Sequence, residues 1–183
     1  MGQGAKNGIL IKSATALETA HKIDTVVFDK TGTITNGTPT VTDILPQKIT
    51  VAELLALAAA LEQLSEHPLA QAIVQAAEAK SLLIPSAIAY KQHPGQGITA
   101  TINNIPYAAG NAALMAAHGI SIDKQQQQNL AHAGKTPLYF SREQELLGCI
   151  ALADTVKTTS PAAISALKPV SYTHLRAHET VLD

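Results

Sequence analysis

A short apolar run at residues 25–28, Thr-Val-Val-Phe, is followed at once by the polar segment 29–35, Asp-Lys-Thr-Gly-Thr-Ile-Thr. β-Branched and aromatic residues that end in turn residues are typical of a strand buried on both faces of a parallel sheet. Asp29 would then lie at the carboxyl end of that strand, where ligands and catalytic groups gather in α/β folds. This feature predicts an α/β core with a carboxylate at its functional edge.

Two roles are open to Asp29 at this position. Its carboxylate can attack a γ-phosphoryl group and carry it as an aspartyl phosphate, with Lys30 and the backbone N–H groups of residues 31–33 near the incoming charge. An Asp before such a turn can also simply cap it. The residue types alone leave both roles open.

Composition excludes several classes of protein. With 183 residues, 46% of them hydrophobic, the chain can build a core for one domain or two small ones. A formal net charge of −1 gives no basic surface for nucleic acid or for a membrane. No apolar run approaches the ~18 residues that span a bilayer, and the first residues contain no apolar core of a signal peptide. The single Cys149 lies in an apolar segment and predicts a buried thiol. We expect this chain to be soluble and not to bind nucleic acid.

Hydrophobic spacing divides the chain into four parts. We expect residues 46–142 to form an inserted α+β domain, an antiparallel sheet flanked by helices. It would separate two parts of a parallel-sheet domain, of which 1–45 includes a linker and the first part and 143–170 the second; residues 171–183 would form a tail. The predicted strands are 9–12, 25–28, 38–45, 137–140 and 145–153, with further strands and a hairpin at Asn103-Asn104 within 88–108. The predicted helices are 14–21, 51–64, 69–80, 111–117, 123–133 and 161–168.

A second group of residues in the insertion is suited to a nucleotide base. An adenine pocket needs an apolar wall, a backbone that approaches the ring closely and a few polar groups for the ring edge. Each signal is weak alone, because Gly-x-Gly is commonly a simple turn and a His before Pro is commonly a local cap. Together they predict a base-binding pocket formed by Glu62, His67, Gly95, Gly97, Ile98, Gly110 and Asn111.

These motifs carry a family resemblance. Segment 29–35 resembles the phosphorylation signature of P-type ATPases, and Ser-Glu-His-Pro at 65–68, Gly-x-Gly at 95–97 and Gly-Asn at 110–111 resemble the nucleotide domain of the heavy-metal-transporting branch. The resemblance implies a partial HAD-like (Rossmannoid) phosphorylation domain with an inserted nucleotide-binding domain. It implies ATP and Mg²⁺ as cofactors, with the metal at Asp29 and Thr31. The implied catalytic residues are Asp29, Lys30, Thr31, Gly32 and Thr33.

The resemblance also implies a place in the cell. The chain would be the catalytic fragment, on the cytoplasmic side of the membrane, of a pump that exports a heavy metal, with Cu⁺ favoured and zinc, cadmium or lead open. The transported ion would bind only to transmembrane helices that this sequence does not contain. We expect the fragment itself to be inactive in phosphoryl transfer.

Two further features of the sequence bear on the other functions. Thr31 stands where phosphatases of this fold carry a second Asp as general acid and base, which disfavours a small-molecule phosphatase but leaves a non-catalytic ATP-binding module. The Thr-Gly-Asp and Gly-Asp-Gly-x-x-Asn-Asp motifs of P-type ATPases do not follow residue 168, and segment 171–183 is too polar for a buried strand. We therefore expect 171–183 to be a non-native tail, and we predict no metal site at its His174 and His178.

Overall fold

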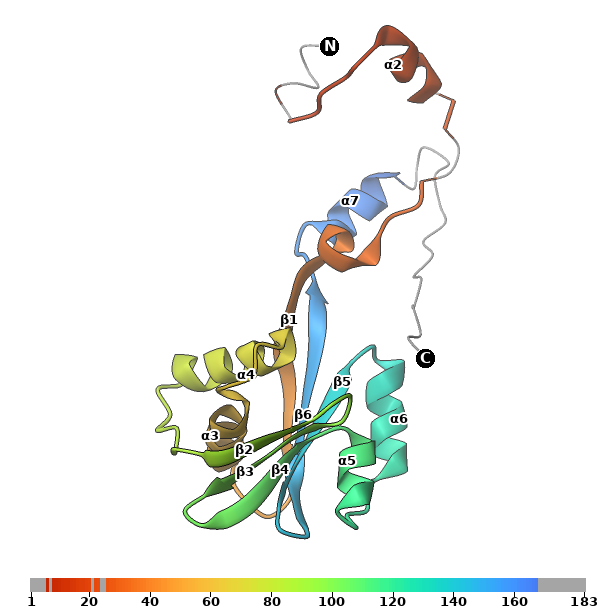
Figure 1. The fold of residues 1–183 in the computed structure, drawn as a ribbon. Coiled ribbons are helices and arrows are strands. Elements are labelled where there is room, and N and C mark those ends of the chain that lie inside the picture. Colours follow the sequence, from red (N-terminus) through yellow and green to blue (C-terminus); the bar gives the residue numbers. More distant parts are fainter. Residues whose placement is uncertain (1–5, 7, 21, 24–25, 168–183) are drawn as a thin grey trace. The chain divides into compact units, whose positions relative to one another are not determined.

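The computed structural model describes residues 6, 8–20, 22–23 and 26–167, and Figure 1 shows their arrangement. The chain forms two compact units. One is Gly37–Thr155, and the other combines Met1–Asn36 with Val156–Asp183. The predicted limits of the insertion, 46 and 142, both fall inside the first unit, because the strands on either side of the insertion belong to its sheet. The division into functional domains stays a prediction.

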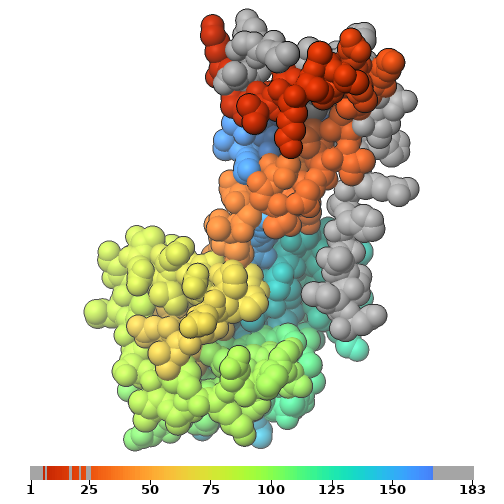
Figure 2. Space-filling model, turned by 45° about the horizontal axis from the view of Figure 1, so that its top comes forward, coloured from red at the N-terminus to blue at the C-terminus, as the bar shows by residue number. Residues whose placement is uncertain are grey.

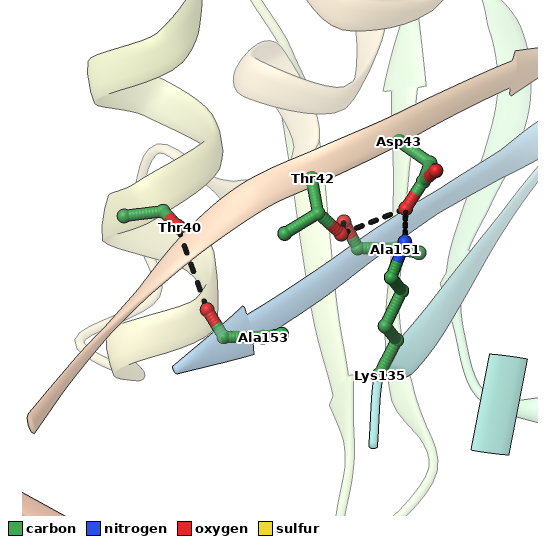
Figure 3. Close-up of polar contacts among 6 residues, drawn as sticks. All are labelled: Thr40, Thr42, Asp43, Lys135, Ala151 and Ala153. Atoms are coloured by element: carbon green, nitrogen blue, oxygen red, sulfur yellow. Dashed lines mark hydrogen bonds and ion pairs between the residues drawn. The ribbon is translucent and has the colours of Figure 1, made fainter. Parts of the chain in front are cut away.

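Within the described residues, the six strands form one sheet in the order β1-β6-β5-β4-β3-β2. Neighbours from β2 to β6 pair antiparallel. At the end of the sheet, the Thr40 side chain of β1 donates a hydrogen bond to the carbonyl of Ala153 of β6, 3.5 Å away, and the Thr42 hydroxyl lies 3.2 Å from the Ala151 carbonyl oxygen (Figure 3). The strands are Thr35–Pro46 (β1), Ile88–His93 (β2), Gly97–Ile102 (β3), Ile105–Gly110 (β4), Thr136–Arg142 (β5) and Glu145–Val156 (β6).

Two predictions for this sheet have clear outcomes. The hairpin at Asn103-Asn104 is confirmed, because both residues adopt positive φ of 52° and 64° and join β3 to β4. The assignment of strand 145–153 to a parallel sheet is wrong, because β6 pairs antiparallel with β5 from Thr136↔Leu152 to Arg142↔Glu145. An apolar strand pattern reports burial on both faces and does not reveal the direction of its neighbours.

Helices cover both faces of this sheet (Figure 1). α3 and α4 pack with one set of strand residues, including Ala109, Phe140 and Ile150. The alternate residues, such as Ala108 and Tyr139, pack on the other face with side chains from α5 and α6. Successive strand residues therefore point to opposite cores, as the period of two requires. The helices of the chain are Ala14–Ala20 (α2), Val51–Glu62 (α3), Pro68–Ala79 (α4), Ala112–Ala117 (α5), Lys124–His132 (α6) and Ser160–Leu167 (α7).

The predicted helices of this unit are confirmed, and their first residues explain where they begin. Thr50 and Glu53 form a reciprocal capping box at α3, and Pro68 occupies the first turn of α4 where its missing N–H costs nothing. Asn111 and Asp123 accept hydrogen bonds from the first backbone N–H groups of α5 and α6. Among the described residues, no helix is long and apolar enough to cross a membrane.

A polar contact joins the strand that opens the unit to the strand that follows α6. Asp43 of β1 and Lys135, the residue before β5, form an ion pair 2.5 Å long, and Thr42 donates to the same carboxylate at 2.8 Å (Figure 3). The Lys135 side chain is the largest cause of the lowered pKa of Asp43. Lys135 thus fixes the start of β5, whose first residues line the pocket described below.

The unit that contains Asp29 differs most from the predictions. Residues 26–29 form no strand and Val27 is 70% exposed, so the predicted buried strand at 25–28 is wrong over its described part. The predicted strand at 9–12 is also absent, and Leu10 is 86% exposed. A strand is stable only where a neighbour takes up its backbone hydrogen bonds, and no described segment pairs with either run. No parallel, Rossmannoid sheet is therefore seen in the described part of the chain.

Candidate functional site

Asp29 is exposed and directly precedes the turn Lys30–Ile34. Its backbone is extended, with φ −66° and ψ 140°, and its side chain makes no capping hydrogen bond to that turn. The alternative in which Asp29 only caps a turn therefore has no support in this geometry. The carboxylate stays open to solvent, as a nucleophile must be before its substrate arrives.

The turn after Asp29 is fixed by contacts within its own unit. Gly32 adopts φ 76°, and the buried Thr35 hydroxyl donates to the Lys30 carbonyl at 3.0 Å. From beyond the insertion, Lys157 Nζ donates to the Gly32 carbonyl at 2.6 Å, and the Ser160 hydroxyl donates to the Ile34 carbonyl at 2.8 Å. The structure thus brings a second lysine, Lys157, to the predicted catalytic turn of Lys30, Thr31, Gly32 and Thr33.

The donors near this turn do not by themselves make a magnesium site. Mg²⁺ in phosphoryl-transfer sites is held by one or two carboxylates together with phosphates and waters. Asp29 offers one carboxylate and Thr31 one hydroxyl, and the described part of the chain has no group of three or more His, Cys, Asp or Glu side chains that could hold a metal ion. Asp29 and Thr31 would therefore hold Mg²⁺ only together with phosphate oxygens and waters.

The larger unit contains a pocket of about 280 Å³ between the α3–α4 pair and the strands. In Figure 2 the yellow segment of α3 and α4 lies beside the green strands β2 to β4. A second hollow of about 550 Å³ adjoins the pocket and shares Ser65, His67, Gln92 and Ile98 with it. The pocket is lined by Glu62, Ser65, His67, Leu69, Ala70, Gln92, His93, Gly95, Gln96, Gly97, Ile98, Asn111, Thr136, Pro137 and Leu138.

The turn between β2 and β3 forms one wall of this pocket. The Gln96 N–H donates to the His93 carbonyl at 3.0 Å, and Gly95 between them adopts φ 70°. Proline followed by a residue with positive φ is the pattern of a type II turn, which explains the sequence Pro94-Gly95. The turn presents bare backbone to the pocket, because Gly95 carries no side chain.

Gly97 and Gly110 are directly paired across β3 and β4. A Cβ atom on Gly97, whose φ is 145°, would lie 2.1 Å from the Ala109 carbonyl oxygen. A Cβ atom on Gly110 would lie 2.2 Å from the Gln96 carbonyl oxygen. The close approach of two strands therefore requires both glycines, independently of any ligand.

Asn111 connects this turn to helix α5. Its Oδ1 accepts hydrogen bonds from the N–H groups of Ala113 and Leu114 at 3.0 and 3.1 Å, and its Nδ2 donates to the Gly95 carbonyl at 2.9 Å. Its own backbone N–H donates to the Gln96 carbonyl at 2.8 Å. One side chain thus caps the helix and holds the glycine turn in place.

Glu62, the last residue of α3, is the buried acid of the pocket. It is 7% exposed, and burial raises the pKa of its carboxyl to about 7. Within the described chain no hydrogen bond or ion pair holds the carboxylate, and the nearby Tyr90 hydroxyl donates instead to the Ala60 carbonyl. A carboxyl that lies in a pocket without a protein partner is available to a ligand.

His67 lies at the opening of the pocket and also begins helix α4. Its Nδ1 accepts a hydrogen bond from the Leu69 N–H at 3.2 Å, so the neutral ring carries its proton on Nε2. Its backbone N–H donates to the Ser65 hydroxyl at 3.3 Å. His67 is therefore both a cap and a wall residue that contributes to both hollows.

Six of the seven residues predicted for base binding line this pocket. The exception is Gly110, which pairs with the pocket residue Gly97 across β3 and β4. The prediction did not include His93, whose Nε2 is 3.0 Å from the Thr99 hydroxyl, or the start of β5 at residues 136–138. The family-like segment Lys-Thr-Pro-Leu at 135–138 was a sequence signal that pointed to this second region.

Comparison with known protein families identifies the class to which this fold and the turn after Asp29 belong. A family model described as haloacid dehalogenase-like hydrolase matches residues 23–173. A copper-exporting P-type ATPase of Staphylococcus aureus (strain Newman) is 46% identical over 169 residues, which cover 91% of this chain and 21% of that protein. A protein named "Probable copper-importing P-type ATPase A" from Enterococcus hirae is 41% identical over 169 residues, 91% of this chain and 23% of that protein.

Solved structures agree with these relatives. A zinc-transporting PIB-type ATPase in the E2·Pi state has a TM-score of 0.80 at 39% identity, covering 93% of this chain and 28% of that one. The N-domain of HMA8, a copper-transporting P-type ATPase, has a TM-score of 0.52 at 30% identity, covering 61% of this chain and 97% of that one. A structure of the catalytic domain of the CPx-ATPase CopB-B, described for its conformational changes upon nucleotide binding, has a TM-score of 0.64 at 26% identity, covering 87% and 55%.

The chain therefore belongs to the heavy-metal-transporting P-type ATPases, within the haloacid dehalogenase-like hydrolases. It spans about a fifth of the length of the curated relatives that it matches.

Proposed function

We propose that this chain is the catalytic part of an ATP-driven heavy-metal pump and lies on the cytoplasmic side of the membrane. ATP binds in the pocket of the larger unit, and in the whole protein Asp29 accepts its γ-phosphoryl group. The observation that carries the proposal is the pocket itself, which gathers Glu62 and His67 from one stretch of the chain and the glycine turn from another. The similar catalytic domain of CopB-B, which changes conformation upon nucleotide binding, supports the same class of ligand.

The residues of the pocket suit the base of ATP. Leu69, Ile98 and Leu138 supply apolar walls for a flat ring, and Gly95 and Gly97 let the backbone approach it. The carboxyl of Glu62 is the polar group at the ring edge. The adjoining hollow, which includes Lys91, offers room and one positive charge for the more polar part of the nucleotide.

Phosphoryl transfer needs the second site. Asp29 supplies the nucleophile, while Lys30, Lys157 and the backbone of the turn supply positive charge and N–H donors to the transferred group. When bound, Mg²⁺ would neutralise the phosphates, with Asp29 and Thr31 among its ligands. Thr31 supplies no carboxylate to activate water, which favours a phosphorylated intermediate that persists over the rapid turnover of a phosphatase.

The transported metal in the proposal is Cu⁺, moved outward. Support comes from relatives named as copper-exporting, although one is named as copper-importing and a similar structure as zinc-transporting. The ion would bind in transmembrane helices that the described residues do not include. Transport by the whole protein, with defined Cu⁺ or Zn²⁺ in sealed vesicles, tests the ion and its direction.

The proposal makes binding and phosphorylation separable in this chain. We expect the 183-residue chain to bind ATP with a Kd in the micromolar to millimolar range, equivalent to roughly 4 to 8 kcal/mol. His67→Gln should weaken binding by about tenfold, or ~1.4 kcal/mol, whereas Asp29→Asn should not change it. Isothermal titration calorimetry measures all three affinities.

We expect no phosphoenzyme from the same chain, because the segment before Asp29 has no sheet to hold it in the described structure. A hydroxylamine-sensitive label from γ-labelled ATP would contradict that expectation. Absence of ATP binding at millimolar concentration would contradict the proposed function.

Asn111→Ala is expected to weaken ATP binding by about tenfold, because it releases the Gly95 carbonyl as well as the start of α5. The lost cap should lower the free energy of unfolding by about 1 kcal/mol. Asp123→Ala is the matched control, since Asp123 caps α6 in the same way but does not line the pocket. Equal ATP affinities in the two variants, measured by calorimetry, would show that the Asn111 contact to the turn has no role in binding.

A further inference from the structure

The hydroxyl of Tyr90 in β2 is bound to the last turn of α3, beside the proposed base site. It donates a hydrogen bond to the backbone carbonyl of Ala60, which lies shortly before Glu62 at the end of the helix. Backbone carbonyls in the last turn of an α-helix have no donor within the helix, so they depend on other groups or on water. Tyr90 thus ties the end of α3, which carries the acid of the pocket, to the sheet.

The backbone of β2 is irregular next to this tyrosine. The pairing of β2 with β3 shifts register between Ile88 and Lys91, and Ala89 adopts a positive φ of 55°. An irregularity of this kind changes the direction of the side chains beside it. A positive φ is strained for alanine, and such strain persists only where the surrounding structure holds it. The half-buried Tyr90 packs against the core that includes α3 and lines the hollow that adjoins the pocket.

Glu62 depends on its backbone for its position. As far as the described residues show, no hydrogen bond or ion pair orients its carboxyl group. The chain turns directly after it, since the Ser65 N–H donates to the Glu62 carbonyl at 2.9 Å. A binding group has to be held within about 0.5 Å of its productive position. A contact that holds the last turn of α3 therefore also sets how well Glu62 meets the edge of a base.

The two side chains also interact electrostatically. Burial, and after it the charge of Glu62, raise the pKa of Tyr90, so the charge of the carboxylate reaches the tyrosine hydroxyl. The hydroxyl donates to the Ala60 carbonyl and not to the carboxylate. Tyr90 therefore leaves the acceptor oxygens of Glu62 open to a ligand while it holds the backbone that carries them.

We propose that Tyr90 is a positioning residue of the nucleotide site, which acts through the last turn of α3 to place the Glu62 carboxyl against the exocyclic amine of adenine. The inference rests on the proposed function and adds to it the residue that makes recognition of this amine effective. In this arrangement Tyr90 does not touch the amine. Loss of its hydroxyl should therefore affect only the part of the affinity that Glu62 supplies.

The test compares ATP with purine riboside triphosphate, which has a hydrogen in place of the exocyclic amine. Calorimetry on the full chain measures both Kd values at about pH 8, above the pKa of Glu62 of about 7, where the carboxyl is ionised. Tyr90→Phe keeps the ring and removes the hydroxyl. It should weaken ATP binding by about tenfold and leave the affinity for the analogue unchanged, because the analogue has no amine for Glu62 to accept from.

A double-mutant cycle separates positioning from a general loss of structure. Glu62→Ala should remove the preference for ATP over the analogue. Tyr90→Phe added to Glu62→Ala should then have no further effect on ATP binding, because the hydroxyl acts only through that carboxyl. Circular dichroism of each variant verifies that it is folded.

Tyr139→Phe is the matched control. Tyr139 is also a buried tyrosine of the sheet, but its hydroxyl has no hydrogen-bond partner among the described residues, and it lines neither hollow. Both affinities should stay at their wild-type values in this variant.

The outcomes separate this inference from the proposed function. Equal weakening of ATP and of the analogue by Tyr90→Phe would overturn it, since the hydroxyl would then support the whole pocket and not the Glu62 contact. An unchanged ATP affinity in Tyr90→Phe, or an equal loss in the Glu62→Ala background, would overturn it as well. In each of these cases ATP still binds and the proposed site stands. Failure of the unaltered chain to bind ATP would remove the proposed site itself.

Discussion

Gly97→Ala should destabilise the larger unit by about 4 kcal/mol and abolish ATP binding with it. The new Cβ would lie 2.1 Å from the Ala109 carbonyl oxygen and 2.6 Å from the Cα of Gly110. Both contacts are with backbone of the paired strand, which cannot move without breaking the β3–β4 register. Overpacking of this kind costs about 1 to 3 kcal/mol, and a side chain at a φ of 145° adds strain of about 1 to 3 kcal/mol. Urea denaturation followed by circular dichroism measures the loss.

Gly134→Ala is the matched control for that prediction. Gly134 also has a positive φ, 67°, but a Cβ atom there meets nothing within 4 Å. Only the left-handed backbone is penalised, by about 1 to 2 kcal/mol. Equal losses of stability in the two variants would show that the close approach of the strands at Gly97 does not constrain the fold.

Glu62→Gln should stabilise the chain at about pH 8 by as much as about 3 kcal/mol and leave its stability unchanged near pH 4. The pKa of Glu62 is raised from 4.5 to about 7 in the folded chain, so the folded state binds the proton more tightly than the unfolded state. The stability of the wild type must then fall as pH rises from about 4.5 through about 7, and the full cost of burying the anion is present above that range. Glutamine carries no charge and avoids this cost at every pH.

A second glutamate of the same helix provides a control of opposite sign. Hydrogen bonds from the Thr50 N–H and hydroxyl lower the pKa of Glu53. Its ionised form therefore stabilises the fold above its ordinary pKa, and that contribution is lost as pH falls through the lowered value. Glu53→Gln should destabilise the chain at neutral pH, with the difference shrinking in acid. Unfolding curves recorded across the pH range measure the stability of both variants. If the stability of Glu62→Gln changed with pH in the same way as that of the wild type, burial of the Glu62 carboxylate would not be the cause of the pH dependence.

The sequence alone determined the local features of this protein. Proline and capping residues set the starts of α3 and α4, and the two asparagines at 103 and 104 set a hairpin, because each acts through its own backbone neighbours. Of the six predicted residues that line the pocket, four belong to short sequence motifs: His67, Gly95, Gly97 and Asn111.

Only the tertiary structure decided how strands pair and what each side chain does. The apolar segment 145–153 fits a parallel or an antiparallel neighbour equally well, and the pairing of β6 with β5 settled that choice. No sequence pattern shows that Gly110 pairs with the pocket residue Gly97, or that Lys157 reaches the turn after Asp29. The pKa of Glu62 likewise depends on the desolvation that surrounding helices and strands create, which is a property of packing and not of the residue or its neighbours in sequence.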